Sequence, residues 1–354
     1  MGNLICGTGK SIINGIYDLL FAKTDKDDNK IFPTSQIKNP FCFKYDGSEI
    51  FWCEWWTLYL YGNENGKICG MINYIFIKGL NGIGRCIIYP AILNDNERKN
   101  GWNIYYLTSF KSDNDTISIS SNNIIKVSND EYIFNGETED KDIKWNLTIN
   151  KKYETLCVAQ KIKLGINTSI NLPNIENATF ASIIPFGYVS GNIIIDGVTY
   201  AINQYGEMDH IWGPVLLPTV NWNLIFGGDD DGNLLYCLHT PSISTLEEKG
   251  CIFLNLNNKK YLIRDYDLTE FINSNDYPDK IIITAIYQDI IIEYNILSKS
   301  ASEPGSASEN HIKINIKCGS EKYVLFGMAE YYRKSYRIFN EENNTDKLIH
   351  QLIN

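Results

Sequence analysis

Residues 143–151 read Ile-Lys-Trp-Asn-Leu-Thr-Ile-Asn-Lys, and this stretch decides the fold class. The hydrophobic residues Ile143, Trp145, Leu147 and Ile149 are each separated by one polar residue. This alternation is typical of a β-strand with one buried face and one solvated face, because successive side chains of a strand point to opposite sides. The same pattern recurs through most of the chain, so the sequence predicts an all-β protein.

Dipeptides that favour positive φ, and therefore tight hairpins, recur between these segments. They are Asn65-Gly66, Asn135-Gly136, Asp196-Gly197 and Asp231-Gly232. Helical patterns are few, and we expect helices only over 11–22, over 266–274 and in the tail after residue 340. Many short strands joined by tight turns predict antiparallel barrels or sandwiches.

The expected strands are too many for one small barrel, since about eight strands already fill one. Two β-barrel domains are therefore predicted, with Pro185-Phe186-Gly187 marking the join. The expected parts are an N-terminal helix and lead-in over 1–45, a first barrel over 46–184, a second barrel over 185–340 and a tail over 341–354.

Composition excludes several classes of partner. The 354 residues carry a net charge of -10, so no basic surplus is present to neutralise nucleic-acid phosphates. No run of about 18 apolar residues predicts a transmembrane segment, and no secretory signal is visible, so we expect a cytoplasmic protein. The nine cysteines include no C-x-x-C pair, which favours buried, reduced thiols over a zinc site, and no metal is expected. Met1-Gly2 and Cys6 leave open a lipidated N-terminus, with peripheral membrane contact through residues 1–22.

The first segment with chemical potential is 51–61, in which Glu54 lies among Trp52, Trp55 and Trp56. A carboxyl group surrounded by aromatic surface is poorly solvated and can serve as a general acid near neutral pH. The alternative is that Glu54 accepts hydrogen bonds from the backbone or an arginine while the tryptophans fill the barrel.

The second segment is 205–213, which contains Glu207, Asp209, His210 and Trp212. Asp209 is the best candidate for proton transfer, because a protonated Asp can protonate an alkene and leave a carbocation that aromatic faces stabilise. Glu207 is two residues away and is expected on the same strand face, whereas His210 is expected on the other. The alternative is a turn aspartate bonded to its own backbone, with Trp212 in the core.

A third pair of candidates, Tyr236 and His239, lies on a later expected strand. Tyr236 is expected to line or brace a substrate pocket. His239 is a candidate substrate contact, although a single histidine on such a strand is also typical of ordinary packing.

At these segments the sequence resembles the AttH and carotenoid 1,2-hydratase superfamily, which is related to tocopherol cyclase-like and Diels–Alderase-like proteins. The motifs that carry the resemblance are Glu54-Trp55-Trp56, Gly206-x-x-Asp209-His210-x-Trp212-Gly213, Trp222, the turn Asp231-Gly232 with Leu235-Tyr236, and Gly327-Met328-Ala329-Glu330-Tyr331. Their order and spacing cover most of the chain from about residue 50 to 335.

The resemblance implies two lipocalin-like barrels, an apolar isoprenoid or polyketide substrate and no redox cofactor. It also implies that Asp209 is the acid, because the hydratases protonate their alkene with the Asp of a Tyr-x-Asp pair. Here Glu207 stands where that pair has Tyr, and no His-x-Trp pair occurs between 175 and 190. These departures argue against carotenoid hydration itself.

The sequence therefore predicts a lyase or isomerase that hydrates, dehydrates, isomerises or cyclises an apolar terpenoid-like or polyketide-like molecule without a cofactor. Asp209 is the expected acid, assisted by Glu54 or Glu207, and the expected substrate contacts are Trp55, Trp56, His210, Trp212, Tyr236 and His239. Two alternatives stay open, namely a lipid or isoprenoid carrier that uses the same cavity and a scaffold whose barrels are filled by side chains.

Overall fold

The computed structural model describes twelve segments of the chain. They are 39–49, 51–62, 68–79, 84–94, 97–163, 177–214, 222–239, 251–263, 266–271, 280–285, 289–299 and 308–332. Within them, no helix is long and apolar enough to cross a membrane. The expected N-terminal helix, the expected membrane contact of residues 1–22 and the expected C-terminal tail lie outside these segments.

The first sheet contains thirteen strands among the described residues, in the order β4-β3-β2-β1-β13-β12-β10-β9-β8-β7-β6, with β5 paired to β3 and β11 paired to β12. Its strands are β1 (Trp52–Tyr61), β2 (Ile68–Lys78), β3 (Gly84–Asn94), β4 (Glu97–Asn100), β5 (Asn103–Tyr106), β6 (Phe110–Ser112), β7 (Thr116–Ile119), β8 (Asn122–Lys126), β9 (Glu131–Glu137), β10 (Ile143–Lys151), β11 (Leu156–Lys163), β12 (Asn177–Ile195) and β13 (Val198–Gly213). A single 3₁₀ turn, η2 (Leu107–Ser109), joins β5 to β6.

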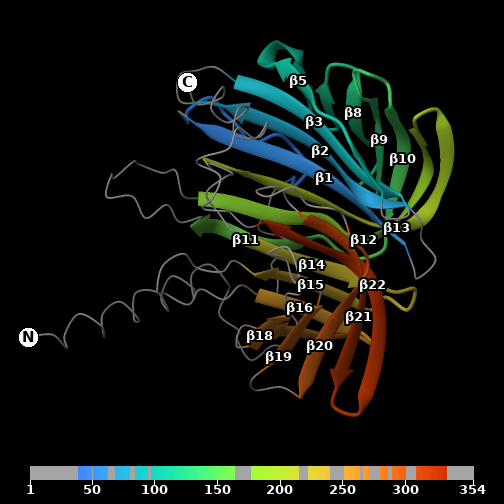
Figure 1. Cartoon of the computed structure of the whole chain (residues 1–354). Coiled ribbons are helices and arrows are strands. Elements are labelled where there is room, and N and C mark those ends of the chain that lie inside the picture. The colour runs from blue at the N-terminus through green and yellow to red at the C-terminus, as the bar shows by residue number, and fades with distance from the viewer. Residues whose placement is uncertain are drawn as a thin grey trace, which may run out of the picture.

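The second sheet contains nine strands among the described residues, in the order β17-β16-β15-β14-β22-β21-β20-β19-β18. Its strands are β14 (Trp222–Gly228), β15 (Leu234–His239), β16 (Cys251–Leu256), β17 (Lys259–Ile263), β18 (Tyr266–Phe271), β19 (Lys280–Ala285), β20 (Ile290–Lys299), β21 (Ser308–Cys318) and β22 (Glu321–Tyr332). Both sheets are antiparallel throughout and curl into barrel-like halves that pack against each other (Figure 1). The predicted all-β fold of two lipocalin-like barrels is therefore confirmed.

Strand alternation divides the buried side chains into three cores. One core fills the interior of the first sheet and another fills the interior of the second sheet. The third core lies between the two sheets and takes residues from both. Odd-numbered residues of β1 and β13 face this middle core, whereas their even-numbered residues face the interior of the first barrel. We call the middle core the inter-barrel core.

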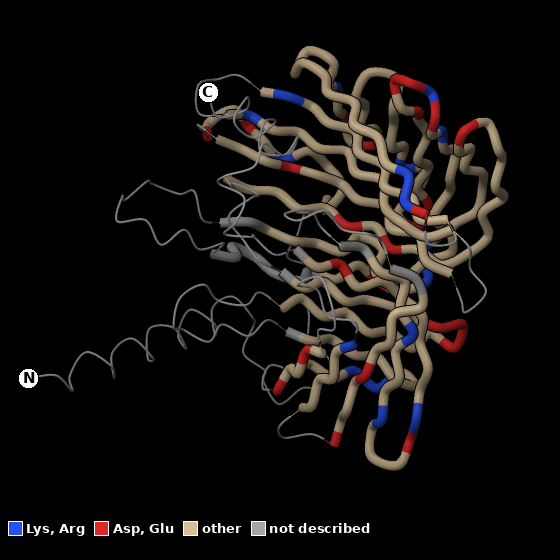
Figure 2. The backbone as a smooth tube through the Cα atoms, in the orientation of Figure 1, with Lys and Arg blue, Asp and Glu red and all other residues tan. Residues whose placement is uncertain are grey.

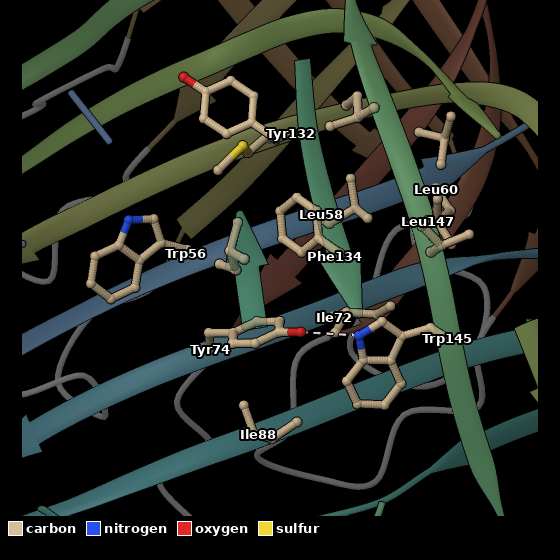
Figure 3. Packing of buried hydrophobic residues seen from close by; sticks show 14 of the residues in the cluster. Trp56, Leu58, Leu60, Ile72, Tyr74, Ile88, Tyr132, Phe134, Trp145 and Leu147 are labelled. Carbon is tan, nitrogen blue, oxygen red and sulfur yellow. Dashed lines mark hydrogen bonds between the residues drawn. The ribbon is translucent and has the colours of Figure 1, made fainter. Parts of the chain in front are cut away.

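The interior of the first barrel is filled by its own side chains, as Figure 3 shows. Trp145 donates its indole N–H to the hydroxyl of Tyr74 at 3.0 Å, and Tyr74 in turn contacts the backbone carbonyls of Asn123 and Asn135. Phe41, from the lead-in, adds a fully buried ring to the same core. These buried side chains form the hydrophobic core of the first barrel.

The turn predictions had different outcomes. Asp196-Gly197 joins β12 to β13 with φ values of 50° and 80°, and Asp231-Gly232 lies in the hairpin between β14 and β15, so both predictions are confirmed. Asn135-Gly136 lies within β9, so that turn prediction is wrong. A Cβ at Gly136 would lie 2.5 Å from the Trp145 ring, so this glycine serves close packing instead of a turn. Asn65-Gly66 lies outside the described residues.

Two further expectations differ from the structure. Residues 266–271 form β18, paired with β19, instead of a helix. The two sheets divide between Gly213 and Trp222, later than the predicted boundary at 185, because β12 continues through Pro185 within the first sheet. Register shifts flank Ile184 at this point, and a bulge tolerates a proline because the missing N–H is not needed for the ladder.

Candidate active site between the two barrels

The candidate site is built on β1 and β13, which pair along nine residues in the middle of the molecule. Thr57 is opposite Asp209 and Tyr59 is opposite Glu207 in this register. Because these positions are odd-numbered, all four side chains point into the inter-barrel core. Figure 2 shows acidic positions along the boundary between the sheets as well as on the outer turns.

The side chain of Asp209 is completely buried, and neither carboxyl oxygen has a hydrogen-bond partner of good geometry among the described residues. Its neighbour Thr57 donates its hydroxyl to Asn73 Oδ1 at 2.7 Å instead. Burial raises the pKa of Asp209 well above its usual value, contacts with Thr57 oppose this, and the charge of Glu330 raises the pKa further. Burial therefore favours the protonated form of the Asp209 carboxyl group.

Glu207 is also completely buried, but it has partners on one oxygen. Ser182 and Tyr236 both donate to its Oε1, at 2.5 and 3.1 Å, while Oε2 has no hydrogen-bond partner within the described part of the chain. Burial raises the pKa of Glu207 well above its usual value, and the charge of Asp209 adds to the shift. Since Tyr236 belongs to the second sheet, this hydrogen bond also joins the two barrels.

The second sheet contributes a third carboxyl group, Glu330, which sequence reasoning did not select. The hydroxyl of Tyr59 donates to Glu330 Oε2 at 2.7 Å across the boundary between the sheets. Burial raises the pKa of Tyr59 and Tyr61 well above the usual value, and the neighbouring carboxylates add to both shifts. These phenols therefore keep their protons. The alternation of Thr57, Tyr59 and Tyr61 in the sequence could have predicted that these residues share the strand face that carries Trp55.

Glu54 lies on the opposite face of β1, in the interior of the first barrel. It accepts hydrogen bonds from the backbone N–H of Lys44 at 2.8 and 3.1 Å, from Trp52 Nε1 at 2.8 Å and from His210 Nε2 at 2.9 Å. His210 also contacts the carbonyl of Pro40 through Nδ1. Glu54 and His210 thus hold the lead-in 39–49 against the end of the first barrel, and they are separated from Asp209 by the sheet itself.

The remaining predicted site residues are divided between the three cores. Trp56 and Trp212 flank His210 inside the first barrel, each with its ring centroid 4.5 Å from the imidazole. Trp55 packs on the inter-barrel core together with Asp209, Glu207 and Tyr236. His239 lies at the end of β15, where its Nδ1 is 2.9 Å from the hydroxyl of Tyr266 in the second barrel.

No family model and no curated protein matches the sequence. Among solved structures, an AttH-type protein from Nitrosomonas europaea aligns with a TM-score of 0.65 and 14% identity over 84% of this chain and 97% of that chain. The chain has the AttH fold. Kievitone hydratase from Nectria haematococca follows with a TM-score of 0.57 and 12% identity over 81% of this chain and 90% of that chain. CghA follows with a TM-score of 0.50 and 10% identity over the same shares.

The resemblance read from the sequence motifs is thus confirmed at the level of architecture. Identity of 14% or less shows the AttH fold alone, and chemistry must be argued from this chain's own site. That site combines Asp209, whose pKa is raised by burial, with two further carboxyl groups and buried phenols, all in an apolar setting. Such an arrangement can deliver a proton to a bound molecule and take one back.

Proposed function

We propose that the protein catalyses proton-initiated addition, elimination or rearrangement on a small apolar molecule bound between the two barrels. The reactions in this class are hydration, dehydration, isomerisation and cyclisation, and terpenoid-like or polyketide-like molecules are the substrates we propose. The observation that carries this proposal is the fully buried carboxyl group of Asp209, which has no hydrogen bond of good geometry within the described segments and only the contacts with Thr57 that lower its pKa. A buried polar group without a partner is costly, so such a group is retained where it acts on a ligand.

In a hydration, Asp209 transfers its proton to an alkene carbon and leaves a carbocation. A water molecule adds to the cation, and the proton that this water loses returns to the carboxylate of Asp209, which regenerates the acid. Dehydration follows the same steps in reverse. In isomerisation, the carboxylate of Asp209 takes a proton from a carbon next to the cation, and a double bond forms there. In cyclisation, a carbon–carbon π bond attacks the cation, and the carboxylate of Asp209 then takes a proton from the carbon next to the new cation. No step in this scheme requires an electron donor or acceptor.

The surroundings of Asp209 support this role. Tyr59, Tyr61, Tyr236 and Phe226 present aromatic surface in the same core, and aromatic faces stabilise positive charge. Met71 and Met328 lie in the same core, and their flexible side chains repack around a bound molecule at low cost. The name of the structural neighbour kievitone hydratase is consistent with the proposal.

The test begins with the ligand. Mass spectrometry of small molecules extracted from protein purified from its native host identifies the substrate or product. The identified molecule is then incubated with wild type and Asp209→Asn protein in D2O. We expect wild type to introduce deuterium at one carbon, and we expect the variant to be slower by a factor of about 10²–10⁴.

Asp231→Asn is the matched control, because it makes the same chemical change on an exposed turn. The control should turn over at the wild-type rate. If Asp209→Asn also keeps the wild-type rate, the assignment of Asp209 fails. If no variant and no wild-type preparation converts a molecule that binds tightly, the protein is a carrier.

A further inference from the structure

The inter-barrel core contains three acidic side chains. Glu207 and Asp209 come from the first sheet and Glu330 from the second, and each of the first two feels the charge of Glu330. In the described part of the chain, no Lys, Arg or His forms an ion pair with Glu207 or Asp209. The electrostatic potential at this point is therefore negative whenever any of these groups ionises.

Four atoms of this cluster point to a ligand. Both carboxyl oxygens of Asp209, Oε2 of Glu207 and the hydroxyl of Tyr61 are buried without a hydrogen bond of good geometry among the described residues, although Thr57 lies close enough to Asp209 to lower its pKa. Groups of this kind in a native protein require an explanation, and a bound ligand is a physical one. An acidic oxygen without a donor is best satisfied by a hydrogen-bond donor or by a positive charge.

Aromatic rings lie in the same inter-barrel core as these carboxyl groups. Phe226 lies at the centre of three tyrosines, with ring centroids 4.9 Å from Tyr59, 5.6 Å from Tyr61 and 5.9 Å from Tyr236. The hydroxyls of Tyr59 and Tyr236 are held by Glu330 and Glu207, which fixes two of the rings. Rings held beside carboxyl groups are the usual recognition site for quaternary ammonium groups.

Two other ligand classes fit this site poorly. An anion would add negative charge beside Glu207 and Asp209, which have no ion pair with a Lys, Arg or His in the described part of the chain. A metal ion needs at least three converging ligands, and no group of three His, Cys, Asp or Glu side chains in the described segments is arranged to hold one. A cation with an apolar body remains the class that satisfies both the carboxyl groups and the rings.

We infer that the inter-barrel site selects organic cations, namely apolar molecules with one positive centre such as a quaternary ammonium. This inference rests on the proposed function in using the same site, and it adds the charge class of the ligand. A stable ammonium compound would occupy the position that a carbocation occupies during turnover, and it would act as a competitive inhibitor.

The test uses the full-length protein and three probes with the same ring and different charge. They are benzyltrimethylammonium, benzyl alcohol and phenylacetate, each titrated by calorimetry. We expect the cation to bind at least about tenfold more tightly than the alcohol and the anion not to bind. Equal affinity for the alcohol or the anion overturns the inference, and so does absence of binding by the cation.

A pH series on the same protein gives a second measurement that requires no variant. The cation does not titrate, so its affinity should rise with pH as Glu207 and Asp209 release protons, because burial raises the pKa of both groups, while Tyr59, Tyr61 and Tyr236 stay neutral. An affinity that does not rise anywhere in the pH range over which the protein stays folded contradicts the inference.

The double variant Glu207→Gln with Asp209→Asn should remove the preference for the cation, provided that its circular dichroism matches wild type. Asp230→Asn with Asp231→Asn is the control, because it changes the net charge by the same amount on an exposed turn. A double variant at the site that binds the cation as wild type does would place binding on the outer surface and overturn the inference. Slow turnover in Asp209→Asn without cation preference in wild type would keep the proposed function and reject only this inference.

Discussion

Glu54 and Asp209 are both completely buried on neighbouring strands, yet their surroundings are opposite. Glu54 receives hydrogen bonds from a backbone N–H, an indole and an imidazole, whereas Asp209 receives none of good geometry within the described residues. The sheet separates them, because one is at an even and the other at an odd position of its strand.

The comparison shows that burial by itself does not identify a chemical role. A saturated carboxylate is a structural anchor, since each of its donors would be left unpaired without it. A carboxyl group that is buried without well-formed hydrogen bonds is costly to the fold, which agrees with the ligand-directed role that we propose for Asp209. Substitutions of Glu54 and Asp209 should therefore change the free energy of unfolding by different amounts. Three predictions follow from this contrast between hydrogen-bonded and unbonded buried groups.

The largest expected effect is the loss of Glu54. Glu54→Leu leaves His210, Trp52 and the Lys44 amide without an acceptor, so the free energy of unfolding should fall by about 3–5 kcal/mol. Urea unfolding followed by tryptophan fluorescence measures this. Asp209→Asn is the comparison and should change stability by less than about 1 kcal/mol, in either direction. Equal losses in the two variants would end the distinction between anchor and acid.

The second effect concerns the dependence of stability on pH. The pKa values of Glu207 and Asp209 are raised by burial, so above about pH 4 the native state holds protons that the unfolded chain has released. The free energy of unfolding should therefore fall as pH rises, by up to about 1.4 kcal/mol per pH unit for each group, until the native pKa is reached.

Urea unfolding at pH 5, 6, 7 and 8 checks this sign. Glu207→Gln with Asp209→Asn should flatten the fall, because the side chains that titrate differently in the two states are gone. A double variant whose stability falls as steeply as that of wild type would show that other groups cause the dependence.

The smallest effect compares two tyrosines on one face of β1. Tyr59→Phe removes the hydrogen bond to Glu330 between the sheets and should cost about 1–3 kcal/mol. Tyr61→Phe removes a hydroxyl that has no partner among the described residues and should leave stability within about 0.5 kcal/mol or raise it. Thermal unfolding of the two variants and wild type provides the measurement. A larger loss for Tyr61→Phe would contradict the hydrogen-bond assignment.

Period-two alternation was enough to predict the all-β class and the split of Asp209 and His210 onto two faces, because side-chain direction is a local property of a strand. The same rule placed Glu207 and Asp209 on one face. The rule did not prevent a wrong helix prediction over 266–274. In β18 the side chains of Tyr266, Leu268 and Glu270 are the more buried ones, but this alternation is too short to exclude a helix from sequence alone.

Pairing between distant strands was not accessible in the same way. Nothing local to Glu330 indicates that it meets Tyr59, because 271 residues separate them and only the packing of two sheets brings them together. The hydrogen bond that the lead-in donates to Glu54 also depends on the tertiary fold. The continuation of β12 past Pro185 likewise depends on its pairing with β13. The local sequence pattern thus singled out the acidic residues Glu54, Glu207 and Asp209, whereas tertiary contacts determine that Glu54 is a structural anchor.

The two faces of β13 differ in which core a substitution would change. Its even positions Met208 and His210 face the first barrel, while its odd positions Glu207 and Asp209 face the inter-barrel core. Point substitutions at the odd positions can therefore change the inter-barrel core while the interior of the first barrel keeps its side chains. A single inserted residue within β13 would exchange the two sets at once, so this strand should tolerate replacement far better than it tolerates a change of length.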